Sequence, residues 1–269
     1  MAIIADFLSN TEIRIEPKCR SCGKTYNALT NTPLAKLRKK EKWYTNAEQM
    51  LNGTSIAKTS AACQVATSTA FRWRHRFLQL LSQGKPAVLS GIVETDEAYF
   101  RESHKGERGL IHPKKRGTKA SKRGLSSEQI PVLVARDRSG QTLTFQLSKV
   151  NRHTVTAVLK PVISKGTVLC SDSKNIYPFV ADQCGVLHKA VNIKAGIRCL
   201  EKVYHIQNVN AYDSRLKNWM RRFHGVATKY LQDYLGWQRW LDIHQTPTPI
   251  QFLKDAICKE NTFQRVMLI

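Results

Sequence analysis

The 269-residue sequence carries 43 lysines and arginines against 20 aspartates and glutamates, which gives a net charge of +23 at pH 7. Apolar residues make up 42% of it and aromatic residues 8%, which is enough for a sizeable core and excludes a wholly disordered chain. So large a positive charge attracts polyanions and indicates a nucleic-acid partner, although a ribosomal-type binder or a merely basic surface would carry the same excess.

The composition does not favour a membrane or secreted protein. No apolar run approaches the roughly 18 residues that a membrane helix needs. Residues 1–10 also lack the basic start and the cleavage site of a signal peptide. The seven cysteines are odd in number and lie mostly among apolar neighbours, which is typical of buried thiols in a reducing compartment. We therefore expect a soluble protein in the cytoplasm, associated with the nucleoid.

Residues 41–82 follow the pattern of three short helices. Helices are expected over 45–51 and 55–63, and Thr67 or Ser68 is a suitable cap for a third. In the third helix one set of side chains recurs at helical spacing and is expected to face the core: Trp73, Phe77, Leu80 and Leu81. The remaining basic side chains are predicted to meet phosphates or base edges: Arg72, Arg74, His75 and Arg76. An ordinary three-helix bundle with a basic outside would show the same pattern.

Residues 87–242 alternate strand-like and helix-like segments. A helix capped by Asn151 is expected to run to about residue 160, and a helical region to begin at about Asn210, with a break near His224 and Gly225. The expected strands are 91–100, 130–136, 142–147 and 166–173. Three early strands followed by helix, strand and helix predict a mixed sheet with helices on its faces.

Between the first two strands, residues 101–129 carry nine lysines and arginines against three glutamates. Glycines and a proline interrupt this segment, which predicts a basic loop that grips phosphates, although a solvated charge run without special purpose is the alternative. The loop cations expected to contact DNA are Lys114, Lys115, Arg116, Lys119, Lys122 and Arg123.

Two aspartates stand where predicted strands end. Asp96 lies near the end of the first strand and Asp172 at the end of a later one, where a hard cation can reach their carboxylates. Asn210 follows 38 positions after Asp172, and Lys217 lies seven residues, or two helical turns, further on the same helix face. Phosphodiester cleavage needs such converging oxygen ligands, because two Mg²⁺ ions about 4 Å apart activate the attacking oxygen and stabilise the leaving one. Strand-end aspartates that merely cap turns are the alternative.

Two glutamates flank the first aspartate. Strand alternation puts Glu94 on the same face as Asp96, as a side chain that could support the ligands, and Glu97 on the opposite face. Glu97 is therefore expected to face solvent.

Four segments carry a family resemblance. They are residues 93–100 (VETDEAYF), 131–140 (PVLVARDRSG), 171–173 (SDS) and 205–217 (HIQNVNAYDSRLK). Together they resemble the catalytic domain of bacterial insertion-sequence transposases of the ISXO2-like group, and the likeness covers most of residues 18–242. The segment 205–217 is the most specific of them.

The resemblance implies a fold and a set of site residues. The group is similar to a branch of the DDE superfamily in which Asn often replaces the last Glu. By that likeness Asp96, Asp172 and Asn210 are the ligands of Mg²⁺ or Mn²⁺, and Lys217 is the lysine of the catalytic helix. Asn208 is a rival third ligand, but the residue seven positions after it is Arg215 rather than a lysine. An amide brings no charge, so weaker binding is expected at the second metal.

The implied fold class is α/β, a ribonuclease-H-like mixed sheet flanked by helices, preceded by an all-α helix-turn-helix domain. Cys19 and Cys22 resemble half of a zinc ribbon, but a closed structural site needs four ligands, so Zn²⁺ binding is doubtful. The implied domains are a partial zinc-ribbon-like segment (1–40), a helix-turn-helix DNA-binding domain (41–86), the catalytic domain (87–242) and a C-terminal tail (243–269).

The function implied by the resemblance is DNA transposition. The protein would bind the terminal inverted repeats of its own element, cut them with water, and use the freed 3′ hydroxyl to attack target DNA. Double-stranded DNA is then the partner, and a homo-oligomer is expected because two ends must be brought together. Two alternatives remain open: a catalytically inactive, transposase-derived DNA-binding protein, and a structure-selective nuclease with the same fold.

Overall fold

The computed structural model describes residues 18–26, 29–31, 33–82, 88–111, 126 and 128–257. The chain forms two compact units: a helical unit of residues 1–84 and 240–269, and a sheet unit of residues 85–239. No helix in the described part of the chain is both long enough and apolar enough to cross a membrane.

The sheet unit is built on five strands in the order β3-β2-β1-β4-β5. β1 pairs antiparallel with β2, and β2 pairs antiparallel with β3, whereas β1, β4 and β5 run parallel. The central strand β1 therefore joins an antiparallel half to a parallel half. The strands are β1 (Ile92–Arg101), β2 (Gln129–Asp137), β3 (Thr142–Gln146), β4 (Val168–Asp172) and β5 (Leu187–Val191).

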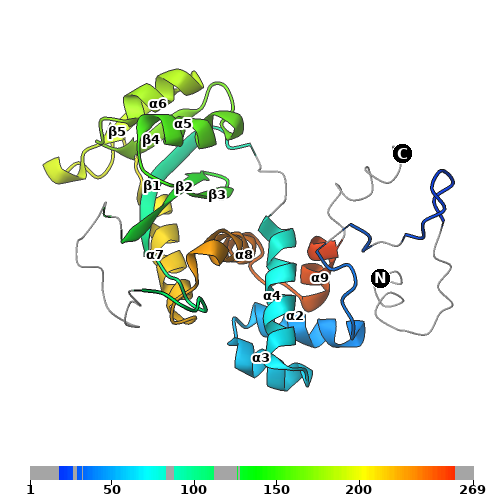
Figure 1. Cartoon of the computed structure of the whole chain (residues 1–269). Helices are drawn as coiled ribbons and strands as arrows, with labels where there is room; N and C mark the ends of the chain where they lie inside the picture. The colour runs from blue at the N-terminus through cyan, green and yellow to red at the C-terminus, as the bar shows by residue number, and fades with distance from the viewer. Residues whose placement is uncertain are drawn as a thin grey trace. The chain divides into compact units, whose positions relative to one another are not determined.

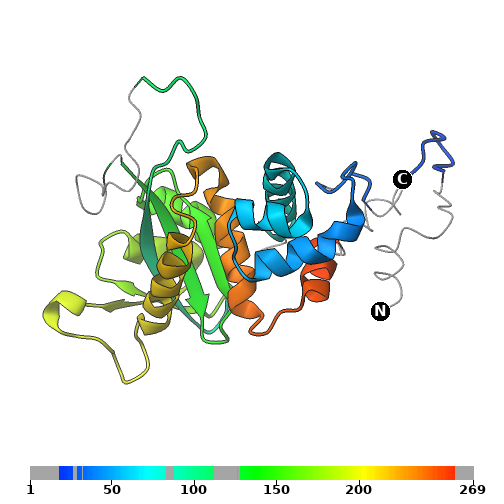
Figure 2. The same ribbon diagram turned by 90° about the horizontal axis from the view of Figure 1, so that it is seen from below.

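Helices cover both faces of this sheet (Figure 1). α5 (Arg152–Leu159) and α6 (Tyr177–Cys184) lie on one face, over a core that includes Val93 and Leu133. α7 (Gln207–Arg221) lies on the other face, where Figure 2 shows it crossing the strands. It packs against β1 and β2, and α8 (Leu231–Ile243) follows it.

Local sequence explains the main boundaries of the sheet unit. The Asn151 side chain accepts the N–H of Thr154 at 2.8 Å and so caps α5. Asp137 holds the turn between β2 and β3, because one of its carboxylate oxygens accepts both the N–H (3.0 Å) and the hydroxyl (2.6 Å) of Ser139. Gly140 has a φ of +92°, a left-handed conformation that glycine adopts without strain.

The helical unit packs four helices around aromatic side chains. Trp43 and Phe77 meet edge to face with ring centroids 5.4 Å apart, and Phe77 and Phe252 lie 6.1 Å apart. Because Phe252 comes from the last helix, the C-terminal segment completes the core that the N-terminal helices begin. The helices are α2 (Trp43–Leu51), α3 (Ile56–Cys63), α4 (Thr67–Ser82) and α9 (Pro249–Ile257). Short 3₁₀ helices also occur at Lys40–Lys42, Lys160–Val162, Ile193–Ala195 and Thr228–Tyr230.

The predicted ribonuclease-H-like mixed sheet flanked by helices is confirmed. α6 and β5 were not predicted, because α6 is short and carries a proline in its first turn, and β5 is an edge strand with weak alternation. The long helical region begins at Gln207, three residues before the predicted start, and breaks between Arg221 and Leu231. The three N-terminal helices follow the expected order, and their use in DNA binding remains a prediction.

Candidate active site

Asp96 and Asp172 lie side by side because their strands pair in parallel. The pairing sets Glu94 beside Cys170, and each aspartate lies two residues further along its strand. Both carboxylates reach one ammonium group. Nζ of Lys174 lies 3.1 Å from Oδ2 of Asp172 and 4.0 Å from Oδ1 of Asp96. The structure thus brings the first two predicted ligands together at the positively charged ammonium group of Lys174.

Glu97 fixes this lysine from the other face of the strand. Its side chain is buried, accepts the Tyr177 hydroxyl at 2.5 Å and is ion-paired with Lys174. The expectation that Glu97 faces solvent was wrong. Alternation does turn it away from Asp96, but α6, which carries Tyr177, covers that face of the sheet.

The ammonium allows three carboxylates to lie close together. Burial raises the pKa of Asp96 above its ordinary value, and the charges of Glu97 and Asp172 add to the rise while Lys174 opposes it. Burial alone would lower the pKa of Lys174, but its hydrogen bond and ion pair with Glu97 and its pairing with Asp172 raise it. Lys174 therefore stays charged at neutral pH.

Glu94 anchors α7 on the central strand. It is buried, and its Oε2 accepts the backbone N–H groups of Asn208 (2.8 Å) and Val209 (3.0 Å) at the start of the helix. Its Oε1 lies 3.1 Å from Nη1 of Arg138. A carboxylate at a helix N-terminus satisfies N–H groups that lack partners within the helix and interacts favourably with the helix dipole. Glu94 therefore sets where α7, with Asn210 and Lys217, lies over the sheet.

Asp213 belongs to the same region, although it was not predicted as a site residue. Its side chain is only 4% exposed, and its Oδ1 has no hydrogen-bond partner among the described residues. Burial raises its pKa to about 7, with the charge of Asp96 adding to the rise and that of Lys217 opposing it. Asn210, Asp213 and Lys217 follow at intervals of three and four residues, so they share one flank of α7. That spacing was the available sequence signal.

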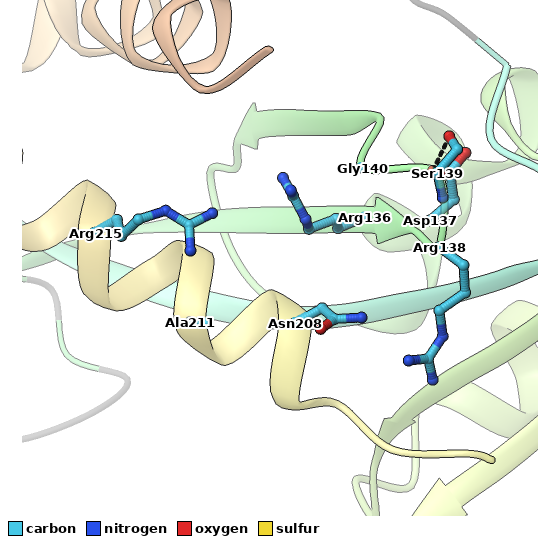
Figure 3. A pocket seen from close by; sticks show the side chains of 8 residues that line it. All are labelled: Arg136, Asp137, Arg138, Ser139, Gly140, Asn208, Ala211 and Arg215. Carbon is cyan, nitrogen blue, oxygen red and sulfur yellow. Dashed lines mark hydrogen bonds between the residues drawn. The ribbon is translucent and has the colours of Figure 1, made fainter. Parts of the chain in front are cut away.

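Asn208 lies on the other flank of α7. With Ala211 and Arg215 it lines a pocket of about 230 Å³ that is closed on the sheet side by the end of β2 and the turn after it (Figure 3). The two asparagines that compete for the third-ligand role thus occupy different environments.

The donor chemistry of the region fits a hard divalent cation. Carboxylate oxygens from two adjacent parallel strands already share the Lys174 ammonium, and oxygen ligands are those that Mg²⁺ and Mn²⁺ prefer. Within the described ranges, no three His, Cys, Asp or Glu side chains are grouped so that they alone would hold a metal ion.

The two predicted zinc ligands lie in a tight turn. The N–H of Gly23 bonds to the Cys19 carbonyl at 2.9 Å, and Sγ of Cys19 lies 3.0 Å from the Ser21 hydroxyl. The Ser21 side chain and the backbone of Cys22 lower the pKa of Cys19 to about 6. Thiolate character suits a metal ligand, but in the described part of the chain no further His, Cys or acidic side chain completes a site there.

The predicted DNA contacts of α4 differ in exposure. Arg72 is exposed, whereas Arg76 is half-buried and donates to the Pro33 carbonyl at 2.7 Å. The prediction for Arg74 is corrected, because it is 1% exposed and donates to the Thr54 carbonyl at 2.7 Å and the Thr59 hydroxyl at 3.1 Å. Its guanidinium holds α3 and α4 together. The six loop cations predicted between 114 and 123 lie outside the described residues.

The protein thus has a ribonuclease-H-like sheet in which two adjacent parallel strands carry a pair of neighbouring aspartates. The family model of the ISXO2-like transposase domain matches residues 88–240, more than half of the chain. The chain belongs to this family.

Solved structures give only a distant likeness, and the curated proteins give no match. A pre-cleavage Mos1 transpososome is 10% identical with a TM-score of 0.33, over 94% of this chain and 85% of that one. The Mos1 strand transfer complex is 12% identical with a TM-score of 0.33, over 80% and 77%. The Mos1 transposase paired-end complex with the left transposon end is 12% identical with a TM-score of 0.31, over 95% and 85%. Likeness at this level carries no conclusion about function.

Replacing Glu94 tests the anchoring of α7. Glu94→Gln keeps the shape but removes the charge that faces the two N–H groups and Arg138, so we expect a loss of about 1–3 kcal/mol in the free energy of unfolding. Urea unfolding of the full chain measures it. Glu201→Gln is the matched control, since Glu201 is an exposed partner of Lys189 and its loss should cost little. Equal effects of the two substitutions would contradict the anchoring role.

Asp213 makes stability depend on pH. The unfolded chain loses this proton near pH 3.8, whereas the folded protein keeps it up to about pH 7. The native state binds the extra proton between these values, so stability falls as the pH rises through that window and stays reduced above it.

Asp213→Asn should remove this dependence. We expect the variant to match the wild type near about pH 4 and to exceed it above about pH 7, by no more than about 4 kcal/mol. Urea unfolding over a pH series in the presence of a chelator measures the difference. Parallel stability curves for the two proteins would show that Asp213 titrates normally.

Proposed function

We propose that this chain is a DNA transposase that binds the terminal inverted repeats of an insertion sequence and catalyses metal-dependent strand cleavage and strand transfer. The observation that carries the proposal is the meeting of Asp96 and Asp172, from adjacent parallel strands, at the Lys174 ammonium in a chain of the ISXO2-like transposase family. The net charge of +23 supports double-stranded DNA as the partner.

Asp96, Asp172 and Asn210 would hold Mg²⁺ or Mn²⁺. The bound metal would supply Lewis-acid activation of the attacking oxygen and charge stabilisation of the leaving oxygen. The lysine that now bridges the aspartates neutralises their repulsion and keeps both carboxylates turned to the same point. Glu94 holds α7, and with it Asn210, against the strand that carries Asp96.

The two flanks of α7 favour Asn210 over Asn208 as the third ligand. Asn210 shares its flank with Asp213, whose carboxyl is close enough to Asp96 for that charge to raise its pKa. Asn208 lines a pocket together with three arginines, whose positive charge would repel a metal cation. Asp213 therefore connects the flank that carries Asn210 with the neighbourhood of Asp96.

Lys217 and the basic loop would contact DNA. Lys217 is exposed two helical turns after Asn210, in reach of a phosphate next to the scissile bond. The base of the loop after β1 is fixed, since Lys105 donates to the Gly225 carbonyl at 2.8 Å and Ser103 and Thr228 exchange hydrogen bonds. The protein would act on chromosomal DNA in the cytoplasm, as a homo-oligomer that brings two element ends together.

Cleavage of the element's own ends tests the function. DNA flanking the reading frame that contains inverted repeats should be cut in the presence of Mg²⁺, and Asp172→Ala should reduce the rate by at least about a thousandfold. The measurement is release of labelled strand, with EDTA as one control and Glu201→Gln as another. Wild-type protein that binds the ends without cutting them would indicate an inactive DNA-binding protein. Cleavage without joining to target DNA would indicate a nuclease.

Paired asparagine substitutions test the third ligand. Asn210→Ala should lower cleavage by about a hundredfold or more, because it removes a metal ligand, and should weaken Mn²⁺ binding measured by calorimetry. Asn208→Ala is the matched control on the same helix and should leave Mn²⁺ binding unchanged. Equal losses of Mn²⁺ binding in the two variants would contradict the assignment of Asn210. A larger loss in Asn208→Ala would assign the third ligand to Asn208 instead.

A further inference from the structure

Three of the eight residues that line the pocket beside α7 are arginines. Arg136 and Arg138 come from the end of β2 and the turn that follows, and Arg215 comes from α7 (Figure 3). Residues about 80 positions apart in the chain thus surround one space of about 230 Å³. The guanidinium groups of Arg136 and Arg215 point toward each other across this space, whereas that of Arg138 is turned away and pairs with Glu94 (Figure 3). Two like charges on either side of so small a volume favour an anion between them.

The single acidic side chain in the lining does not neutralise this charge toward the pocket. Asp137 is 5% exposed, and its Oδ1 accepts three hydrogen bonds from its own turn, given by the N–H and hydroxyl of Ser139 and the N–H of Gln141. Figure 3 shows Asp137 and Ser139 bonded to each other at the edge of the pocket. The carboxylate shapes the turn, and the arginines define the charge.

The arginines are held in place. The guanidinium groups of Arg136 and Arg215 lie 5.6 Å and 5.8 Å from the ring centroid of buried Tyr212. Arg138 donates to His205 Nε2 at 2.7 Å and to the Val203 carbonyl at 2.9 Å, and it pairs with Glu94. A planar guanidinium fixed in this way matches two oxygens of a phosphate group and loses little conformational freedom on binding.

The lining indicates which part of a nucleic acid fits. Ala211 is the only apolar side chain among the lining residues, and no aromatic ring is included on which a base could stack. We propose that this pocket binds a backbone phosphate of double-stranded DNA, held by Arg136 and Arg215, on the flank of α7 opposite Asn210 and Lys217. The assignment rests on the proposed function, because it takes DNA to be the substrate of the sheet unit.

Binding of a labelled DNA duplex over a series of salt concentrations tests this site without any need for cleavage. Arg215→Ala should weaken binding about tenfold and reduce the slope of log affinity against log salt by about 1. Arg215→Lys should recover the slope, since the charge remains, but only part of the affinity, since the planar fork is lost. Arg152→Ala is the matched control, because Arg152 is exposed on α5, on the other face of the sheet, and its loss changes the net charge equally. It should leave the slope unchanged.

The outcomes separate this inference from the proposed function. Equal binding by Arg215→Ala and Arg152→Ala would overturn the pocket assignment, even if the wild type cuts element ends. A selective loss in Arg215→Ala would support it, even if no cleavage is found. Calorimetry with inorganic phosphate is the remaining arm: tight binding that Arg215→Ala abolishes, together with unchanged duplex affinity, would assign the pocket to a small phosphate ligand and overturn the DNA assignment.

Discussion

The arrangement of the site depends on one buried carboxylate, that of Glu94. α7 presents unpaired N–H groups at its start, and burying them without acceptors would cost free energy. Glu94 reaches up from the central strand and accepts two of them, while its second oxygen faces Arg138. The same strand carries Asp96 two residues later. The bonds of Glu94 to the start of α7 therefore fix where the helix lies on the sheet and how far along β1 it begins relative to Asp96.

Near Glu94, several acidic side chains lie closer together than their mutual repulsion would allow without the lysine side chains among them. Asp96, Glu97 and Asp172 surround the Lys174 ammonium, and Asp213 lies near Lys217. A further glutamate at position 210 would add another negative charge to this group. In the proposed site the neutral amide of Asn210 would add no such charge, and Asp213 keeps its proton up to about pH 7.

α7 separates two kinds of chemistry. One flank carries Asp213 near Asp96 and suits a cation, whereas the other carries Arg215, faces Arg136 and suits an anion. Phosphoryl transfer needs both, since a metal must act on the reacting oxygens while phosphates elsewhere on the same strand are held still. In the proposed function, the two flanks of one helix would keep these tasks apart and fix the spacing between them.

The sequence by itself determined the features that depend on short stretches of chain. β-forming runs placed four of the five strands, and Asn151 and Ser55 marked helix starts through their own side-chain hydrogen bonds. The break predicted near His224 and Gly225 lies between the end of α7 and the start of α8. The strand-end position of Asp172 also follows from local pattern, whereas Asp96 was expected near the end of its strand and lies in the middle of β1, which continues to Arg101.

Only the tertiary structure decided which charged groups are buried and what they meet. Glu97 was expected to be exposed to solvent, but it is covered by α6, a helix that was not predicted from the sequence. Arg74 was expected to contact DNA, but its side chain is buried inside the helical unit. The burial of Asp213 and the arginine pocket both arise from the packing of α7 on the sheet. The reason is physical: the cost of burying a charge depends on partners supplied by distant segments, and local periodicity carries no information about them.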